Sequence, residues 1–148
     1  MTVSRELEVL RQLPALSRVS DARLKMIALL CGIESYKPGD YILREGEHSS
    51  KVHLVMSGAV ECLVGGEQKP VRLLHEVVVD PRLFGGLAAL SNRPQMHSVR
   101  ATAETEALCM PNETAIEIIR DNPEIAMNLL KNYAERFDNV VRLLRERG

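Results

Sequence analysis

Glycines and small apolar residues gather in one stretch that could bind a phosphate, LFGGLAALSNRPQMHSVRA at Leu83–Ala101. Two adjacent glycines, a short apolar run and a proline are typical of a strand end, a tight turn, one helical turn and a new strand. A helix that begins at such a turn directs free backbone N–H groups towards an anion. The stretch therefore indicates either a phosphate site or a turn that requires Gly85 and Gly86 for their backbone dihedral angles.

The cysteines and histidines form no pattern that supports metal binding or nucleophilic catalysis. Three cysteines without a CxxC pair favour buried, reduced thiols: Cys31, Cys62 and Cys109. Neither HxH nor HExxH spacing occurs among the four histidines: His48, His53, His75 and His97. No GxSxG motif is present. We expect no catalytic residue, no metal and no enzyme activity; the enzymatic alternative is a small β-barrel of the cupin type.

Length and charge indicate one folded domain that does not depend on nucleic acid. The 148 residues are 45% hydrophobic and 26% charged, with a formal net charge of -1, which predicts a soluble globular domain. This balance argues against direct nucleic-acid binding through a broad positive field. No apolar run approaches the roughly 20 residues of a membrane span, and no signal peptide is evident. We expect a cytoplasmic location.

Two helices are predicted in residues 1–32. Leucines at helical spacing indicate a first helix over Glu6–Leu13, which Pro14 ends. Ser20 is a suitable N-cap for the second helix, and Gly32 is its expected stop. One apolar face of this helix comprises Leu24, Ile27 and Ala28.

Residues 33–110 are predicted to form short strands separated by turns. A strand at Tyr41–Arg44 follows a Pro-Gly-Asp turn, and further strands flank the Ser57-Gly58 turn. Gly65-Gly66 is the expected tip of a hairpin that returns over residues 71–79. Such a pattern is typical of a compact β-roll or sandwich.

Residues 112–148 are predicted to be helical. Asn112 is a suitable N-cap for a first helix, and Asn122 precedes a second one with Pro123 at its first position, over residues 123–147. The apolar positions of the first of these helices are Ile116, Ile118 and Ile119.

The second of these helices carries a heptad seam, in which apolar residues recur at spacings of three and four. The seam comprises Met127, Leu130, Ala134, Phe137, Val141 and Leu144. We expect the half Met127–Ala134 to pack on the chain's own β-roll. The half Phe137–Leu144 should project beyond it, because a helix rises 1.5 Å per residue, and pair with a second copy. Burial of each large side chain is worth roughly 1.5–3 kcal/mol.

Three sequence blocks in this order resemble the cyclic nucleotide-binding domain of catabolite-activator-type regulators, kinase regulatory subunits and gated channels. They are YKPGDYILREGE at Tyr36–Glu47, LVMSGAVECLV at Leu54–Val64 and FGGLAALSNRP at Phe84–Pro94. The resemblance implies one domain over residues 1–148, mainly β with flanking helices. It would be a β-roll or jelly-roll barrel with two N-terminal helices and a long C-terminal helix that pairs two subunits. No DNA-binding domain of the kind that follows this helix in such regulators is expected within these residues.

The family's phosphate-binding cassette reads much like F-G-E-x-A-L-L, followed by P-R-x-A-T/S. Its glutamate binds the ribose hydroxyl and its arginine neutralises the cyclic phosphate. The chain keeps the frame of the cassette: Phe84, Gly85, Leu87, Ala88, Leu90, Pro94 and Ser98. Gly86 stands in place of the glutamate and Gln95 in place of the arginine. The resemblance therefore implies a cassette that has lost both charged anchors.

Three further positions of the cassette depart from the family. Met96 and His97 take two usually small positions, of which strand alternation allows only one to point inward, and Pro81 replaces a glycine. Arg100 shares a strand face with Ser98, which makes it a better substitute for the missing cation than Arg93.

Loss of the arginine should weaken the binding free energy of a cyclic nucleotide by about 3–5 kcal/mol, because the buried phosphate charge is left without its partner. That is roughly two to four orders of magnitude in affinity, and the lost ribose contact adds about 1.5–3 kcal/mol. We therefore expect a non-enzymatic regulatory or sensor module that acts through dimerisation or a protein partner, with weak or no cAMP or cGMP binding and no other cofactor. The alternative is a functional nucleotide sensor with a rearranged phosphate clamp, as in the effector domain of a longer transcription regulator.

Overall fold

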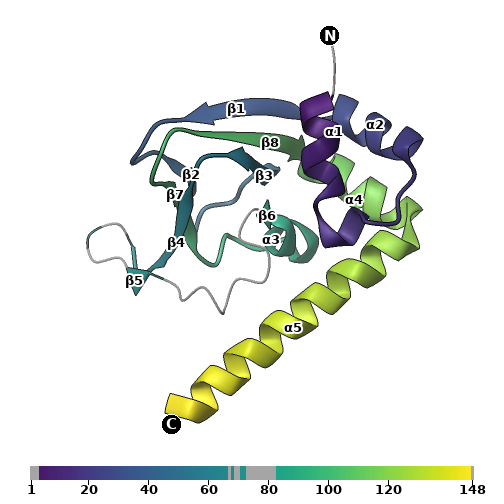
Figure 1. Ribbon diagram of the computed structural model, residues 1–148. Helices are drawn as coiled ribbons and strands as arrows, with labels where there is room; N and C mark the ends of the chain where they lie inside the picture. Colours follow the sequence, from purple (N-terminus) through teal and green to yellow (C-terminus); the bar gives the residue numbers. More distant parts are fainter. Residues whose placement is uncertain (1–3, 67, 69–70, 73–82, 148) are drawn as a thin grey trace.

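Two antiparallel four-stranded sheets form a β-roll in the computed structural model, which describes residues 4–66, 68, 71–72 and 83–147 (Figure 1). Sheet A has the order β1 (Gly32–Tyr36), β8 (Thr105–Pro111), β3 (Lys51–Ser57) and β6 (Leu83–Phe84). Sheet B has the order β2 (Tyr41–Leu43), β7 (Ser98–Ala101), β4 (Val60–Val64) and β5 (Val71–Arg72). The predicted fold, mainly β with flanking helices, is confirmed.

Helices cover one end of the roll. They are α1 (Ser4–Arg11), the 3₁₀ turn η1 (Pro14–Leu16), α2 (Asp21–Leu29), α3 (Gly86–Ser91), α4 (Asn112–Asp121) and α5 (Pro123–Arg147). In Figure 1, α1, α2 and α4 lie together beside the roll, and α5 runs from them diagonally below it. The C-terminal end of α5 extends away from the strands, as the sequence predicted.

Adjacent residues of β3 face two separate cores, because side chains alternate along a strand. Leu54 belongs to an outer core between sheet A and the helices, and Val55 belongs to an inner core inside the roll. The outer core comprises Leu10, Leu13, Leu16, Leu24, Ile27, Ala28, Leu54, Leu108 and Ile125. The inner core comprises Leu43, Val55, Cys62, Phe84 and Val99.

The N-terminal helices differ from the prediction at their ends. The first one ends at Arg11 rather than Leu13, since the residue before a proline is disfavoured in a helix and Leu13 is extended. Ser20 caps α2 as predicted and accepts a hydrogen bond from the Arg23 N–H at 3.3 Å. The prediction that Gly32 stops this helix is wrong, because Gly32 begins β1.

The predicted hairpin tip at Gly65-Gly66 lies between β4 and β5, which pair. Of the strand expected over residues 71–79, β5 covers Val71–Arg72, and the remainder lies outside the described residues. Pro81 and His75 also lie outside the described residues.

The C-terminal helices begin nearly where the sequence indicated. Asn112 is not the N-cap of α4: Pro111 holds that place, and the Asn112 amide donates to the carbonyl oxygen of Ser49 at 2.7 Å. Pro123 is the first residue of α5, as predicted. The carbonyl of Asn122 accepts the first helical hydrogen bond of α5, from Ile125 N–H at 2.9 Å.

The prediction that Met127–Ala134 packs on the roll is wrong. Met127 and Leu130 are exposed, whereas Ile125 is buried in the outer core and Leu129 packs against it. The helix thus turns a different apolar stripe towards its own domain and leaves the seam uncovered.

Candidate functional site

The phosphate-cassette segment begins with a turn that fits only glycine. Gly85 has a φ of +93°, in the left-handed region that favours glycine. A Cβ at Gly85 would also lie 3.2 Å from the carbonyl oxygen of Lys51. Phe84, immediately before it, is buried in the inner core and anchors the turn. The predicted requirement for glycine dihedral angles is confirmed at Gly85.

Gly86 has little space for a side chain, and its dihedral angles do not call for glycine. It lies in the first turn of α3 and has no positive φ, so the prediction that it needs glycine dihedral angles is wrong. A Cβ at Gly86 would lie 3.0 Å from the hydroxyl oxygen of Tyr133. Because Tyr133 belongs to α5, the C-terminal helix occupies space that a side chain at position 86 would need.

Gln95 is buried where the resemblance places the phosphate-neutralising arginine. Its N–H donates to the carbonyl oxygen of Glu47 at 3.0 Å, and its own carbonyl accepts from the Gly46 N–H at 2.8 Å. Next to these two backbone hydrogen bonds, the Glu45 N–H donates to Ser98 Oγ at 2.9 Å. The position is thus fixed against the loop after β2, and it presents a neutral amide instead of a cation.

His97 rather than Met96 points towards the interior of the roll. Met96 is exposed, whereas His97 is half-buried with its ring centroid 6.3 Å from that of Phe84 in an edge-on arrangement. The expectation that only one of the two residues points inward is confirmed. Burial lowers the pKa of His97, which favours the neutral imidazole and a poor partner for an anion.

Arg100, the expected substitute cation, is paired with a carboxylate. Its Nε donates to Glu61 Oε1 at 3.0 Å, and its Nη2 contacts the same oxygen. The two residues lie directly opposite each other on β7 and β4, so this is a cross-strand ion pair. The Arg100 guanidinium also lies 5.8 Å from the centroid of the Tyr41 ring. Its charge is therefore balanced within sheet B, and Arg93 is exposed.

Tyr133 of α5 lies beside the cassette at Gly86, and the charge of Arg136 on the same helix acts on His97; neither residue was predicted as a site residue. They are three residues apart, so they share a face of the helix. The Arg136 charge adds to the effect of burial in lowering the pKa of His97. It also opposes the effect of burial on Cys62 of β4, whose pKa rises to about 11. Arg136 thus acts electrostatically on His97 of the cassette and on Cys62 of β4.

A signal for these two residues was present in the sequence. Leu129, Tyr133 and Arg136 recur at spacings of four and three, which places them on one stripe of a helix. This stripe is amphipathic rather than apolar. It was not predicted because the heptad seam on the same helix is the more regular apolar pattern.

A second polar cluster lies on sheet A around Glu34. Its carboxylate accepts from Lys51 Nζ at 2.5 Å and Tyr36 Oη at 2.6 Å, and Cys109 Sγ lies 3.4 Å away. These partners, led by Lys51, lower the pKa of Glu34 to about 2. The His53 ring is buried, which lowers its pKa, and Nε2 lies 4.0 Å from the carboxylate. The cluster links β1, β8 and β3, and its Cys109 thiol has a raised pKa, unlike a reactive nucleophile.

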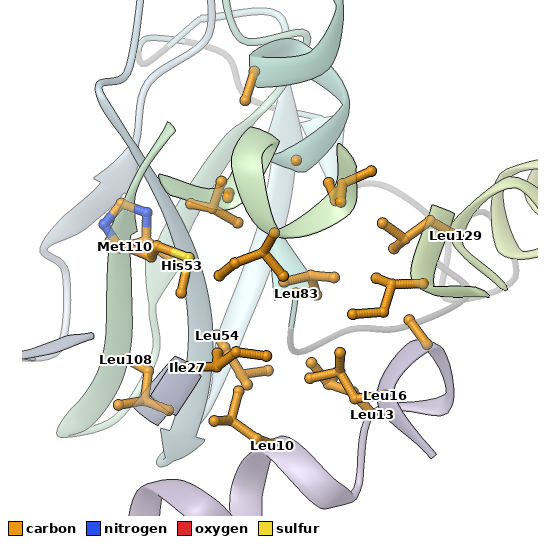
Figure 2. Close-up of a pocket in the computed structure, with 18 of the residues that line it drawn as sticks. Leu10, Leu13, Leu16, Ile27, His53, Leu54, Leu83, Leu108, Met110 and Leu129 are labelled. Atoms are coloured by element: carbon orange, nitrogen blue, oxygen red, sulfur yellow. The ribbon is translucent and has the colours of Figure 1, made fainter. Parts of the chain in front are cut away.

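An apolar cavity of about 130 Å³ lies between sheet A and the helices (Figure 2). Leu10 and Leu16 reach it from the N-terminal segment, and Leu54 and Leu129 from β3 and α5. No Asp, Glu, Lys or Arg is part of its lining, so it offers no permanent positive charge to a phosphate. Gly86 and Tyr133 both border this cavity, which joins it to the cassette.

Within the ranges that the structure describes, no group of three His, Cys, Asp or Glu side chains could hold a metal ion. The same residues contain no helix that is long and apolar enough to cross a membrane.

This chain is similar over much of its length to parts of longer known proteins. The rice (Oryza sativa subsp. japonica) potassium channel KAT1 is 28% identical over 132 residues, which is 86% of this chain and 18% of the channel. The cAMP-dependent protein kinase regulatory subunit of Emericella nidulans is 30% identical over 97 residues, 66% of this chain and 23% of that protein. The chain thus spans about a fifth of the length of these relatives.

The fold agrees with this likeness. The crystal structure of the catabolite activator protein of Thermus thermophilus superposes with a TM-score of 0.74 at 24% identity, over 90% of this chain and 62% of that chain. A family model described as the cyclic nucleotide-binding domain matches residues 33–122, which include α4 and all of the described strands except Gly32, the first residue of β1. The chain belongs to the cyclic nucleotide-binding domain family.

Proposed function

We propose that the chain is a non-enzymatic regulatory module that binds cAMP and cGMP weakly or not at all and acts through a homodimer or a protein partner. The observation that carries the proposal is the cassette itself. Gln95 is a buried neutral amide in place of the arginine, and Tyr133 occupies the space beside Gly86 where the family's glutamate would extend. The phosphate and the ribose would each lose a charged partner.

Calorimetric titration of cAMP and of cGMP into the purified chain tests the weak-binding proposal. We expect no saturable heat at micromolar nucleotide, because the two losses together lower affinity by at least about two orders of magnitude. Saturable heat at micromolar ligand would overturn the proposal.

A set of gain-of-function variants tests whether the missing anchors are the cause. The double variant Gly86→Glu, Gln95→Arg restores both charges but places a Cβ 3.0 Å from the Tyr133 hydroxyl. We therefore expect it to bind cAMP less tightly than the triple variant that adds Tyr133→Phe, which removes only the obstructing oxygen. Tyr133→Phe alone serves as the matched control and should not bind.

A functional sensor with a rearranged clamp remains the second candidate, and one observation favours it. The Arg136 charge contributes to lowering the pKa of His97, which favours a role for this cation of α5 near the cassette. If this candidate is correct, cAMP binds to the native chain and Arg136→Gln abolishes that binding. Binding that survives Arg136→Gln rules out a clamp built from α5.

The dimer is proposed to form through the seam of α5. Phe137 and Leu144 are both 68% exposed, and Met127 and Leu130 are also exposed. An apolar stripe at heptad spacing on an uncovered helix face is the pattern of a two-helix interface. The support for this interface is the exposure of these side chains and their heptad spacing.

Light scattering of the native chain and of Phe137→Glu, Leu144→Glu tests the dimer. We expect the native mass to be that of two chains and the variant mass that of one, since the charges would be desolvated in the seam. Arg142→Glu is the matched control, because it changes the net charge by the same amount at an exposed position outside the seam. An unchanged mass in the double variant would rule out this interface.

A further inference from the structure

The edge of sheet A at β1 is long and regular compared with the other edges of the two sheets. β1 has five residues in continuous register with β8. Among the described strands, the other edges are β2 with three residues and an irregular register, and β5 and β6 with two residues each. Short or irregular edge strands are a common protection against unwanted pairing. β1 lacks this protection, and it contains neither lysine nor proline.

The outer side of β1 is open. Within the described part of the chain, β8 is its only strand neighbour, and β1 forms the upper rim of the roll in Figure 1 with no element above it. In an antiparallel pair every second residue directs its N–H and C=O away from the neighbour. These groups of β1 are therefore available to a further strand.

An exposed apolar patch adjoins this edge. The α2–β1 patch comprises Met26, Leu29, Leu30 and Ile33. Only Cys31 lies between Leu30 and the start of β1. Ile33 is opposite Leu108 of the outer core, so it stands on the sheet face that α2 covers. An extended segment beside β1 would place alternate side chains on this face.

We propose that β1 and the α2–β1 patch form a docking surface for an extended segment of a partner protein, which adds to sheet A as a further strand. The unpaired backbone groups of β1 select an extended peptide, as in other cases of strand addition. The patch selects apolar side chains at alternate positions. Lys25 and Lys37, exposed near the two ends of the surface, favour acidic residues that flank the apolar positions.

A second copy of this chain fits the surface less well than a partner protein does. Two β1 strands paired antiparallel about their centres would place Glu34 opposite its copy, and like charges in that position are destabilising. A further argument rests on the proposed dimer: a second self-interface away from α5 would link dimers into an open filament. The occupant is therefore a segment of another protein.

Selection from a phage-displayed library of random short peptides tests the proposal. The intact native chain is the target, and Ile33→Lys is the counter-target, because a lysine blocks pairing at a strand edge. We expect enriched peptides with alternating apolar residues and acidic flanks, whose affinity for Ile33→Lys is lower by about tenfold or more. Enrichment that does not distinguish the two targets, or no enrichment, would overturn the proposal.

Two controls separate docking from misfolding and from nonspecific apolar binding. Leu90→Lys replaces a residue on α3 that is 44% exposed, close to the 42% of Ile33, and should leave peptide binding unchanged. Hydrogen exchange of the native chain should slow in residues 33–36 when an enriched peptide is bound. Protection confined to α5 instead would show that the peptide binds the seam and would also overturn the proposal. The nucleotide titrations have separate readouts, so either result stands without the other.

Discussion

Two faces of α5 differ in what covers them. On one face, Ile125 is buried in the outer core and Tyr133 reaches the cassette beside Gly86. On the other, Leu130 is 61% exposed and Phe137 is 68% exposed. The inner face is therefore explained by contacts within this chain, whereas the outer face is not. The difference supports the proposal that α5 has two roles, one beside its own cassette and one in an interface with another molecule.

The contact between Tyr133 and α3 would determine how nucleotide binding is coupled to the proposed dimer. Because Tyr133 contacts the first turn of α3, any group that displaces its hydroxyl would have to shift the side chain or the helix. A ligand changes such an equilibrium only through different affinities for the two arrangements. A nucleotide would therefore be coupled to α5 only if it bound more tightly to the arrangement in which Tyr133 is displaced.

The largest expected effect is the difference in unfolding free energy between substitutions on the two faces of α5. Ile125→Ala removes a buried side chain of the outer core and should lower the free energy of unfolding by about 2–4 kcal/mol. Leu130→Ala, its matched control on the seam, should change the stability of the isolated subunit by less than about 0.5 kcal/mol. Urea denaturation at protein concentrations low enough to populate the monomer measures both. Equal losses would mean that the seam is covered within the subunit.

A smaller effect is expected where α5 meets the cassette. Gly86→Ala improves helix propensity by up to about 0.5–1 kcal/mol, but it forces the new Cβ against the Tyr133 hydroxyl oxygen at 3.0 Å. We expect the substitution to be more favourable in the Tyr133→Phe background than in the native chain, with a coupling of about 0.5–1 kcal/mol. A double-mutant cycle of unfolding free energies measures this coupling. Additive effects would show that Tyr133 yields without cost and does not restrict position 86.

Local signals predicted much of this architecture correctly. The glycine turn at Gly85, the Ser20 cap and the start of α5 at Pro123 each depend on a few neighbouring residues, and all three were predicted correctly. Errors arose where a distant partner decides the outcome. The amide of Asn112 bonds to the carbonyl of Ser49, which precedes the neighbouring strand β3 and is far away in the sequence, so it does not cap its helix.

In the candidate site, too, local features could be predicted from the sequence, whereas contacts with distant residues could not. That Gly86 and Gln95 lack charge follows from the sequence alone, but what replaces the charges does not. The pairing of Arg100 with Glu61 depends on the register of β7 against β4. The contact of Tyr133 with Gly86 depends on how a helix from the end of the chain lies across the roll. Neither the register nor this crossing is encoded in a local pattern.

The smallest expected effect concerns pH and the inner face of α5. Burial and the Arg136 charge lower the pKa of His97, and burial lowers that of His53. A histidine with a lowered pKa binds fewer protons in the folded than in the unfolded state, so stability increases with pH across the window from the folded pKa up to about 6.5. We therefore expect the free energy of unfolding to fall on acidification through this window.

Single substitutions show which histidine side chains cause this pH dependence. His97→Gln and His53→Gln should each flatten part of the slope in urea denaturations at pH 7 and at lower pH. Arg136→Gln should raise the pKa of His97, measured by NMR titration of its ring protons, because a nearby positive charge no longer opposes protonation. Arg142→Gln, a loss of the same charge from an exposed position of α5, is the matched control and should leave that pKa unchanged. An Arg136→Gln titration identical to the native one would mean that the inner face of α5 does not act on the cassette electrostatically, and its influence would then be limited to the packing of Tyr133.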